Sequence, residues 1–217
     1  MEPDLLEGKT SVAPESPDST KRRQIMDGAR EVFLSHGFDA ASMGVIARTS
    51  GVSKGTLYVY FDSKQCLFET IVREEFAAQA QVVFSLDPID HDVEAVLTRL
   101  GRGYVNFLCQ PRAISVLRTV ISISERMPEI GKKFYETGPA MGIATLCRYL
   151  ESQVAAGTLV IEDCEVAAAQ FLDSCRATIF RPMLLNAGDA PTDERRNHVV
   201  DIAVRTFLAA YRHVSAI

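Results

Sequence analysis

Residues 42–61 carry the clearest structural signal in the chain: SMGVIARTSGVSKGTLYVYF. Two short apolar patterns of helical spacing lie on either side of Gly51, and each follows a serine that can cap a helix, Ser42 or Ser53. Glycine adopts a positive φ angle at no steric cost, so a turn at Gly51 lets the second helix leave at a steep angle. Two short helices joined by such a turn predict a helix-turn-helix unit.

Helical spacing continues on both sides of this unit. Before it, apolar residues recur every three or four positions from Ser19 to Gly37, which ends the first helix. After it, Ser63 caps a long helix that ends near Pro88. Prolines and glycines separate the further expected helices, which cover residues 92–109, 112–124, 129–156 and 162–186. The third of these is interrupted at 138–139, and the fourth begins at Glu162 or Asp163. Thr192 caps a final helix.

The apolar run 158–161 is the one candidate for a short strand. It is isolated, which favours a connector instead. No sustained alternation of apolar and polar residues occurs elsewhere in the sequence. The chain is therefore predicted to be all-α.

The composition limits the class of protein. Of 217 residues, 47% are hydrophobic and 24% are charged, which is enough apolar material for a sizeable core. No apolar run approaches the roughly 18 residues of a membrane-spanning helix, and the acidic N-terminus lacks the apolar segment of a secretory signal. Five cysteines without a C-x-x-C pair fit reduced thiols, so we expect a cytoplasmic protein with no membrane partner.

The net charge of −5 argues against a nucleic-acid partner only if it is evenly spread. It is not: residues 1–19 carry −4, residues 20–64 carry +3 and residues 65–217 carry −4. We expect a disordered tail over 1–18, which contains three prolines, a helix-turn-helix domain over 19–64 and a second helical domain over 65–217. The net charge of the whole chain therefore does not exclude DNA binding by the basic segment 20–64.

The second helix of the unit carries side chains that suit DNA. It presents Lys54, Thr56, Tyr58 and Tyr60 outward, while Gly55 allows a close approach of the backbone. Hydroxyls and lysines donate to phosphate oxygens, and a helix N-terminus attracts anions. The alternative, an ordinary solvated helix face, fits this spaced pattern less well.

Many spaced positions in this part of the chain agree with one known family at once: Ile25, Ala29, Phe33, Gly37, Phe38, Ile46, Ala47, Gly51, Val52, Ser53, Lys54, Gly55, Thr56, Leu57, Tyr58, Tyr60, Phe61, Lys64 and Leu67. In these residues the chain resembles the DNA-binding domain of the TetR (tetracycline repressor) family. The resemblance implies a homodimeric, ligand-responsive regulator of nine or ten helices, whose second helix-turn-helix member enters the major groove of a palindromic operator.

Transferred to this sequence, the resemblance implies three groups of DNA-binding residues. Lys54, Gly55 and Val59 would face base edges, where a valine can touch only a thymine methyl or fill space. Phosphates would be contacted by Thr56, Tyr58, Tyr60 and Lys64. Ser42 and Met43 would start the preceding helix against the DNA backbone, and Ser53 would start the recognition helix. The cluster 21–23 is a phosphate-contacting arm or a solvated helix end.

The second domain resembles a subtype of the same family. Residues 127–139, MPEIGKKFYETGP, together with 155–159 and 167–171, are similar to the AefR-like C-terminal regulatory domain. That resemblance implies a pocket for a small-molecule effector, with apolar walls and a few polar anchors. The expected lining residues are Tyr104, Phe107, Leu108, Leu117, Arg118, Val120, Phe134, Phe171 and Cys175; Phe76, Phe84, Met127, Met141 and Phe180 are further apolar candidates, and Asn106 and Arg176 further anchors. Each apolar residue taken singly can equally belong to a filled core.

The last two helices are strongly apolar and suggest a subunit interface. Two helices from each of two subunits would form a four-helix bundle by isologous packing. The expected interface residues are Phe171, Ile179, Val199, Ile202 and Phe207. The alternative is a core within one chain.

Catalytic motifs are missing from the sequence. It contains no G-x-x-x-x-G-K-[ST], no H-E-x-x-H and no G-x-S-x-G, and its four histidines lie far apart. We therefore expect no enzyme activity, no cofactor and no metal site. The expected function is a homodimeric repressor released from its operator by a small, largely apolar molecule. The alternatives are an activator or regulator without such a ligand and, more distantly, an all-α enzyme with an incidental helix-turn-helix; a cysteine redox sensor is a minor one.

Overall fold

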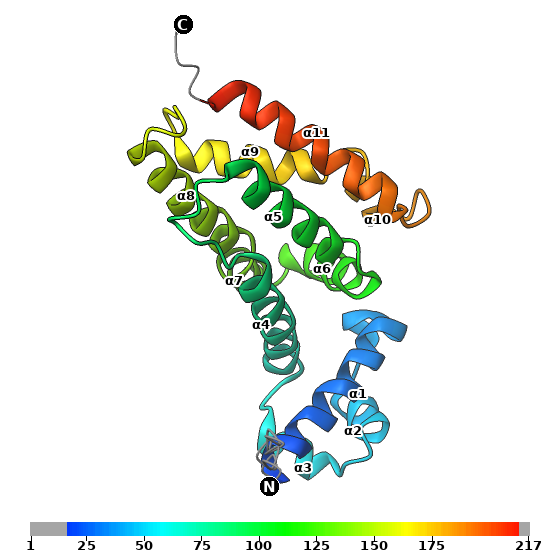
Figure 1. Ribbon diagram of the computed structural model, residues 1–217. Helices are drawn as coiled ribbons and strands as arrows, with labels where there is room; N and C mark the ends of the chain where they lie inside the picture. Colours follow the sequence, from blue (N-terminus) through cyan, green and yellow to red (C-terminus); the bar gives the residue numbers. More distant parts are fainter. Residues whose placement is uncertain (1–16, 213–217) are drawn as a thin grey trace, which may run out of the picture. The chain divides into compact units, whose positions relative to one another are not determined.

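The computed structural model describes the backbone of residues 17–212 and, within that range, all side chains except those of residues 17 and 75–80 (Figure 1). Over this part the chain is all-α, as predicted, with eleven helices and no strand. It divides into two compact units that meet between Leu67 and Phe68. The tail expected over residues 1–18 lies outside the described residues except for its last two, which open the first helix.

The first unit contains three helices, α1 (Pro17–Ala40), α2 (Met43–Thr49) and α3 (Lys54–Tyr60). Each short helix starts at the serine predicted to cap it. The Oγ of Ser42 accepts a hydrogen bond from the Val45 amide at 3.2 Å, and the Oγ of Ser53 accepts one from the Thr56 amide at 3.0 Å. The turn between α2 and α3 places Gly51 at a φ of 63°, the positive value that the sequence predicts.

The expected stop at Gly37 takes the form of a kink inside α1. Gly37 has a φ of 74° and a ψ of 169°, so the regular helix ends there, and one further turn runs to Ala40. Apolar side chains of all three helices pack together in the core of the first unit. The buried set is Ile25, Met26, Ala29, Val32, Phe33, Phe38, Ala41, Met43, Ile46, Ala47, Leu57 and Phe61.

Helices α1 and α2 approach most closely at Gly28. A Cβ built on Gly28 would lie 2.2 Å from the Oγ and 2.8 Å from the Cα of Ser50. Ser50 is buried, its hydroxyl donates to the Ile25 carbonyl at 3.3 Å, and its own carbonyl accepts a hydrogen bond from Nε2 of Gln24 at 2.6 Å. The absence of a side chain at Gly28 therefore fixes how the two helices cross.

Replacing Gly28 by alanine is expected to destabilise the protein by about 1–3 kcal/mol, because the new methyl group meets backbone as well as side-chain atoms. Gly44→Ala is the matched control: its Cβ would approach only the Ser42 Oγ, at 3.9 Å, and alanine favours a helix over glycine by roughly 1 kcal/mol. Urea unfolding followed by circular dichroism measures both changes. Equal stabilities of the two variants would contradict the close approach at Gly28.

Seven of the other eight helices lie wholly in the second unit, while α4 (Lys64–Val83) begins in the first unit and continues into the second. The seven are α5 (Val93–Leu108), α6 (Pro111–Ser124), α7 (Pro128–Thr137), α8 (Pro139–Ala155), α9 (Cys164–Cys175), α10 (Phe180–Leu184) and α11 (Asp193–Tyr211). The predicted caps Ser63, Asp163 and Thr192 each accept a hydrogen bond from an amide three residues later. Residues 158–161 form a connector, which contacts the end of α11 through one isolated bridge between Leu159 and Arg212.

The single helix predicted over residues 162–186 is wrong. The structure breaks it into α9 and α10, and Thr178 between them has a φ of 63°. Pro182 explains the break, because in a continuous helix its ring would clash with the carbonyl of Thr178 and it has no N–H to donate. The break turns Ile179 and Phe180 into the core.

Helices α5, α8, α9 and α11 enclose the main core, and α11 runs alongside α5 and α9 (Figure 1). Phe171 and Phe207 meet there edge to face, with ring centroids 5.5 Å apart. Four of the five expected interface residues are buried inside their own chain by this packing: Phe171, Ile179, Val199 and Phe207. A side chain that has already lost its exposed area cannot bury it again against a partner, so these four belong to the core. Ile202 is 43% exposed.

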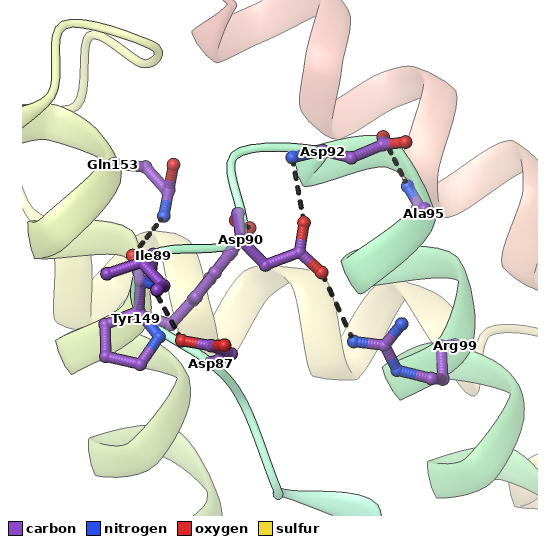
Figure 2. A network of polar contacts seen from close by, with 9 residues as sticks. Asp87, Ile89, Asp90, Asp92, Ala95, Arg99, Tyr149 and Gln153 are labelled. Carbon is purple, nitrogen blue, oxygen red and sulfur yellow. Dashed lines mark hydrogen bonds and ion pairs between the residues drawn. The ribbon is translucent and has the colours of Figure 1, made fainter.

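The segment between α4 and α5 is fastened to α8 by hydrogen bonds (Figure 2). The fully buried Gln153 donates from Nε2 to the Pro88 carbonyl at 3.0 Å, and its Oε1 lies 2.8 Å from Nδ1 of His91. The Tyr149 hydroxyl donates to the Asp90 carbonyl at 2.9 Å. These contacts fix the course of the chain directly after α4.

Candidate nucleic-acid interface and effector cavity

The outer face of α3 combines a lysine with two large exposed side chains. Lys54 is exposed, Tyr58 is 45% exposed and Val59 is 81% exposed, whereas Leu57 is buried and holds the helix to the unit. An isopropyl group that lies almost wholly in solvent contributes nothing to the core. The face is therefore built for something other than packing within its unit.

The other predicted DNA-binding residues of this unit have local partners. Ser42 and Ser53 are exposed and cap their helices, Gly55 is exposed, and the Thr56 hydroxyl lies 2.8 Å from the Ser53 hydroxyl. A hydrogen bond with the Asp18 carboxylate raises the pKa of Tyr60 above its ordinary value. Met43 is buried, so its side chain anchors α2 in the core and cannot reach a DNA backbone.

Lys64 has a structural position that differs from the phosphate contact expected for it. Its Nζ donates to the carbonyls of Phe38, Ala41 and Asp39 at 2.7, 2.9 and 3.3 Å, and it lies 4.4 Å from the centroid of the Phe38 ring. Three carbonyls use all three donors of an ammonium group. Lys64 thus closes the C-terminal end of α1, and its donors are not available to phosphate in this arrangement.

Two side chains of the basic cluster 21–23 also have contacts within the first unit. Lys21 donates to Oε1 of Gln24 at 3.0 Å. Arg22 lies over the Phe61 ring at 5.4 Å and reaches the Met26 sulfur at 3.5 Å. Arg23 is exposed. Arg22 therefore packs on the unit, and Arg23 is the most accessible arginine of the cluster.

The second unit encloses a cavity of about 270 Å³, here called the central cavity. Its walls come from the end of α4, from α5 to α9 and from α10, and they are mostly apolar and aromatic. The lining residues are Val83, Phe84, Tyr104, Phe107, Leu108, Ala113, Leu117, Phe134, Tyr135, Gly138, Pro139, Gly142, Ile143, Ala169, Leu172, Asp173, Arg176 and Phe180. Ligand pockets in proteins measure about 300–1,000 Å³, so this cavity lies just below that range and has room for a small ligand only.

The structure places five of the nine expected lining residues at this cavity: Tyr104, Phe107, Leu108, Leu117 and Phe134. Of the further candidates, Phe84, Phe180 and Arg176 also line it. The side chain of Phe76 lies outside the described residues.

The remaining expected residues point elsewhere. Phe171 and Cys175 are buried in the main core, and Val120 is buried without lining the cavity. Arg118 donates to the carbonyls of Leu184 and Met183 at 2.8 and 2.5 Å, which ties α6 to α10. Among the further candidates, Asn106 accepts from Nε of Arg196 at 2.9 Å, and Met127 and Met141 do not line the cavity.

Tyr135, Gly142, Ile143 and Asp173 line the cavity without having been predicted to do so. Tyr135 follows Phe134 directly in the motif 127–139, and its position beside a predicted residue is the one signal that the sequence offered. The others become neighbours only when α7, α8 and α9 pack together.

Polar groups gather at one side of the central cavity. Arg176 forms an ion pair with Asp173, and its guanidinium lies 5.1 Å from the centroid of the Phe180 ring. The Tyr104 hydroxyl has no hydrogen-bond partner among the described residues, and its ring meets Phe84 edge to face at 6.2 Å. An aromatic cavity that contains a hydroxyl without a partner among the described residues can bind an apolar molecule that carries a hydrogen-bonding group.

Burial raises the pKa of Tyr104 from 10.0 to about 12, although the nearby Arg176 lowers it. As the pH rises, the unfolded chain therefore loses the Tyr104 hydroxyl proton at a lower pH than the folded protein does. The contribution of Tyr104 to the free energy of unfolding is fully present below about pH 10 and is lost as the pH rises toward 12. Tyr104→Phe is expected to reduce the loss of unfolding free energy between about pH 9 and pH 11. Urea titrations at both pH values measure the loss; an unchanged loss in the variant would contradict a buried hydroxyl.

Burial also raises the pKa of two thiols, Cys175 to about 12 and Cys147 to about 11. The thiolate is the reactive form of cysteine, so this environment disfavours redox chemistry at both residues. Over the described residues no group of histidines, cysteines and carboxylates is arranged to hold a metal ion. The described helices include none that is both long and apolar enough to cross a bilayer.

Comparison with known proteins now identifies the family. Residues 25–71 match the bacterial regulatory proteins of the tetR family, and residues 95–213 match the C-terminal domain of the AefR-like transcriptional repressors. The chain belongs to the TetR family. The second match covers more than half of the chain, so the resemblance seen in the sequence is confirmed for both parts.

The curated relatives are similar over about a third of this chain. The repressor AcnR of Corynebacterium diphtheriae is 37% identical over 65 residues, which are 30% of this chain and 34% of that protein. The regulator UidR of Escherichia coli is 32% identical over 81 residues, 36% of this chain and 41% of that protein. The chain thus matches only about a third to two fifths of the length of these relatives.

Solved structures of TetR-family members are similar over nearly the whole chain. The flavonoid-responsive regulator FrrA is 30% identical, with a TM-score of 0.77, and the match covers 91% of this chain and all of FrrA. A TetR-family regulator from Mesorhizobium loti is 23% identical with the same TM-score, and that match covers 92% of this chain and all of the other; at this identity it supports the fold alone.

Proposed function

We propose that the chain is a repressor of transcription that binds operator DNA through α3 and leaves it when a small molecule binds in the central cavity. The observation that carries the proposal is the outer face of α3, where Lys54, Tyr58 and Val59 stand exposed within the segment that matches the tetR family. The curated relatives, which match about a third of this chain, include proteins named as transcriptional repressors.

On DNA, we assign Lys54, Gly55 and Val59 to base edges and Tyr58 to phosphate. Val59 suits a thymine methyl, which is the apolar group of the major groove. Two copies of the chain would place their α3 helices in half-sites about 34 Å apart, or a multiple of it, on a palindromic operator. Because bacterial DNA lies in the cytoplasm, the protein would act there.

The homodimer needs a face that the chain's own core leaves free. Ile202 on α11 is 43% exposed, and it is the member of the expected interface that can still bury area against a second copy. We propose that the exposed side of α11 takes part in the dimer.

We propose a small aromatic molecule with a phenol or carbonyl group as the effector. The aromatic rings of Phe107, Phe134 and Phe180 line the cavity, and the Tyr104 hydroxyl can donate to the polar group. FrrA, which is similar over its whole length, is called flavonoid-responsive, and flavonoids are aromatic phenols of this kind. Binding would favour an arrangement of the dimer that no longer fits the operator, as a population shift.

A mobility-shift assay tests the proposal. The DNA that flanks the coding region is expected to be retarded by the protein, a scrambled duplex of equal length is not, and adding a flavonoid to the complex is expected to release the DNA. Equal retardation of both duplexes would contradict the assignment of α3 to a specific operator. Retardation that no aromatic phenol changes, in a protein that binds the phenol, would contradict the effector part.

A further inference from the structure

The ring of Phe84 separates two hollows in the second unit. One is the central cavity, and the other is a pocket of about 220 Å³, here called the outer pocket, lined by Gln81, Phe84, Met141, Gly142 and Thr145. Phe84 and Gly142 line both hollows. Gln81 is exposed and Met141 is 41% exposed, so the outer pocket faces solvent. In the aromatic wall of the central cavity, Phe107 and Phe180 are buried and Tyr135 is 56% exposed.

Gly142 provides the seat on which the Phe84 ring rests. A Cβ on Gly142 would come within 2.7 Å of Cζ of Phe84 and within 3.2 Å of both ε carbons, so the ring lies directly against the backbone of α8. On the other side, the ring meets Tyr104 edge to face. A residue with any side chain at position 142 would force the ring to move.

The ring can leave this seat without breaking a side-chain hydrogen bond. Its contacts with Gly142 and Tyr104 are apolar and aromatic, so the movement is opposed only by the sum of dispersion contacts of about 0.1–0.2 kcal/mol per atom pair. The segment after Phe84 is held to α8 by contacts that do not involve the Phe84 ring. These are the hydrogen bonds from Gln153 to the Pro88 carbonyl and from Tyr149 to the Asp90 carbonyl (Figure 2). Rotation of the Phe84 side chain therefore does not require that segment to detach from α8.

We propose that Phe84 is the gate of the central cavity: the effector arrives in the outer pocket, displaces the Phe84 ring from Gly142 and passes into the cavity, after which the ring closes behind it. The gate takes uncharged aromatic molecules, since its frame consists of Met141, Gly142 and the Phe84 ring itself. This inference rests on the effector cavity of the proposed function.

Stopped-flow fluorescence tests the gate with N-phenyl-1-naphthylamine, an uncharged aromatic probe whose emission rises in apolar surroundings. Binding that must wait for a conformational change has a reduced association rate, so Phe84→Ala is expected to associate with the probe about tenfold faster than the wild type. Gly142→Ala keeps the phenylalanine but removes its seat, and it is expected to accelerate association as well. Circular dichroism spectra show whether each variant keeps the helical fold.

Leu108→Ala is the matched control, because Leu108 lines the central cavity but not the outer pocket. It enlarges the cavity as Phe84→Ala does, and it is expected to change the dissociation rate while leaving association within about twofold of the wild type. Equal association rates in the wild type, Phe84→Ala and Gly142→Ala would overturn the gate and leave the effector cavity standing. Failure of both the wild type and Phe84→Ala to take up the probe would overturn the cavity, and the gate with it. Uptake by Phe84→Ala alone would support the gate.

Discussion

Replacing Val59 by aspartate is expected to weaken operator binding by about 100-fold or more, since an uncompensated like charge at an interface costs several kcal/mol. Val59 is 81% exposed in the last turn of α3, on its outer face, where the proposed function places it against base edges. A carboxylate there would meet the negative potential of the groove and could accept only from a cytosine amino group. Mobility shifts at fixed salt measure the loss.

Val82→Asp is the matched control for this substitution. Val82 is 78% exposed on α4 in the second unit, so the change in charge and the loss of apolar surface are the same. It is expected to retain operator affinity within about threefold, as exposed substitutions away from a contact surface change energies by at most about 0.5 kcal/mol. If both variants bound the operator as the wild type does, α3 would not be the helix that reads DNA.

Replacing Lys64 by alanine is expected to destabilise the first unit by about 1.5–3 kcal/mol, the range for hydrogen bonds to a charged group. The ammonium closes the end of α1 through three carbonyls, and its loss leaves the Phe38 and Ala41 carbonyls without this donor beside a buried ring. Urea unfolding followed by circular dichroism measures the loss, and hydrogen exchange locates it at the end of α1.

Lys54→Ala separates this structural role from a contact with DNA, because Lys54 is an exposed lysine of the same unit. Its removal is expected to change the unfolding free energy by less than about 0.5 kcal/mol. The sequence-based expectation for Lys64 is a phosphate contact, whose loss weakens DNA binding similarly across sequences and lowers the slope of its salt dependence by about 0.9. An unchanged stability of Lys64→Ala together with that lower slope would restore Lys64 to the DNA interface.

Features encoded within a few residues could be predicted from the sequence. Ser42, Ser53, Ser63, Asp163 and Thr192 cap helices because a short polar side chain reaches an amide three residues later wherever the helix lies in the fold. The turn at Gly51 and the interruption at Gly138-Pro139 are equally local. Pro182 is an equally local signal for the break between α9 and α10, and the helix predicted over 162–186 runs through it.

The candidate sites depended more on contacts between distant parts of the chain. The α3 residues could be assigned because an exposed helix face and its motif are both contiguous in sequence. At the cavity, apolar residues of the same spacing were divided between the lining and the core, and the sequence assigned Phe107 and Phe171 alike to the lining.

Local patterning thus determined that this chain is helical and where its helices begin, and together with the family motif it predicted which helix reads DNA, because each of these depends on neighbours along the chain. The tertiary structure alone decided that Lys64 closes α1, that Phe171 and Phe207 fill a core, and that Phe84 rests on Gly142. Those outcomes depend on which helix faces which, and helical periodicity specifies that a face is apolar without specifying what covers it.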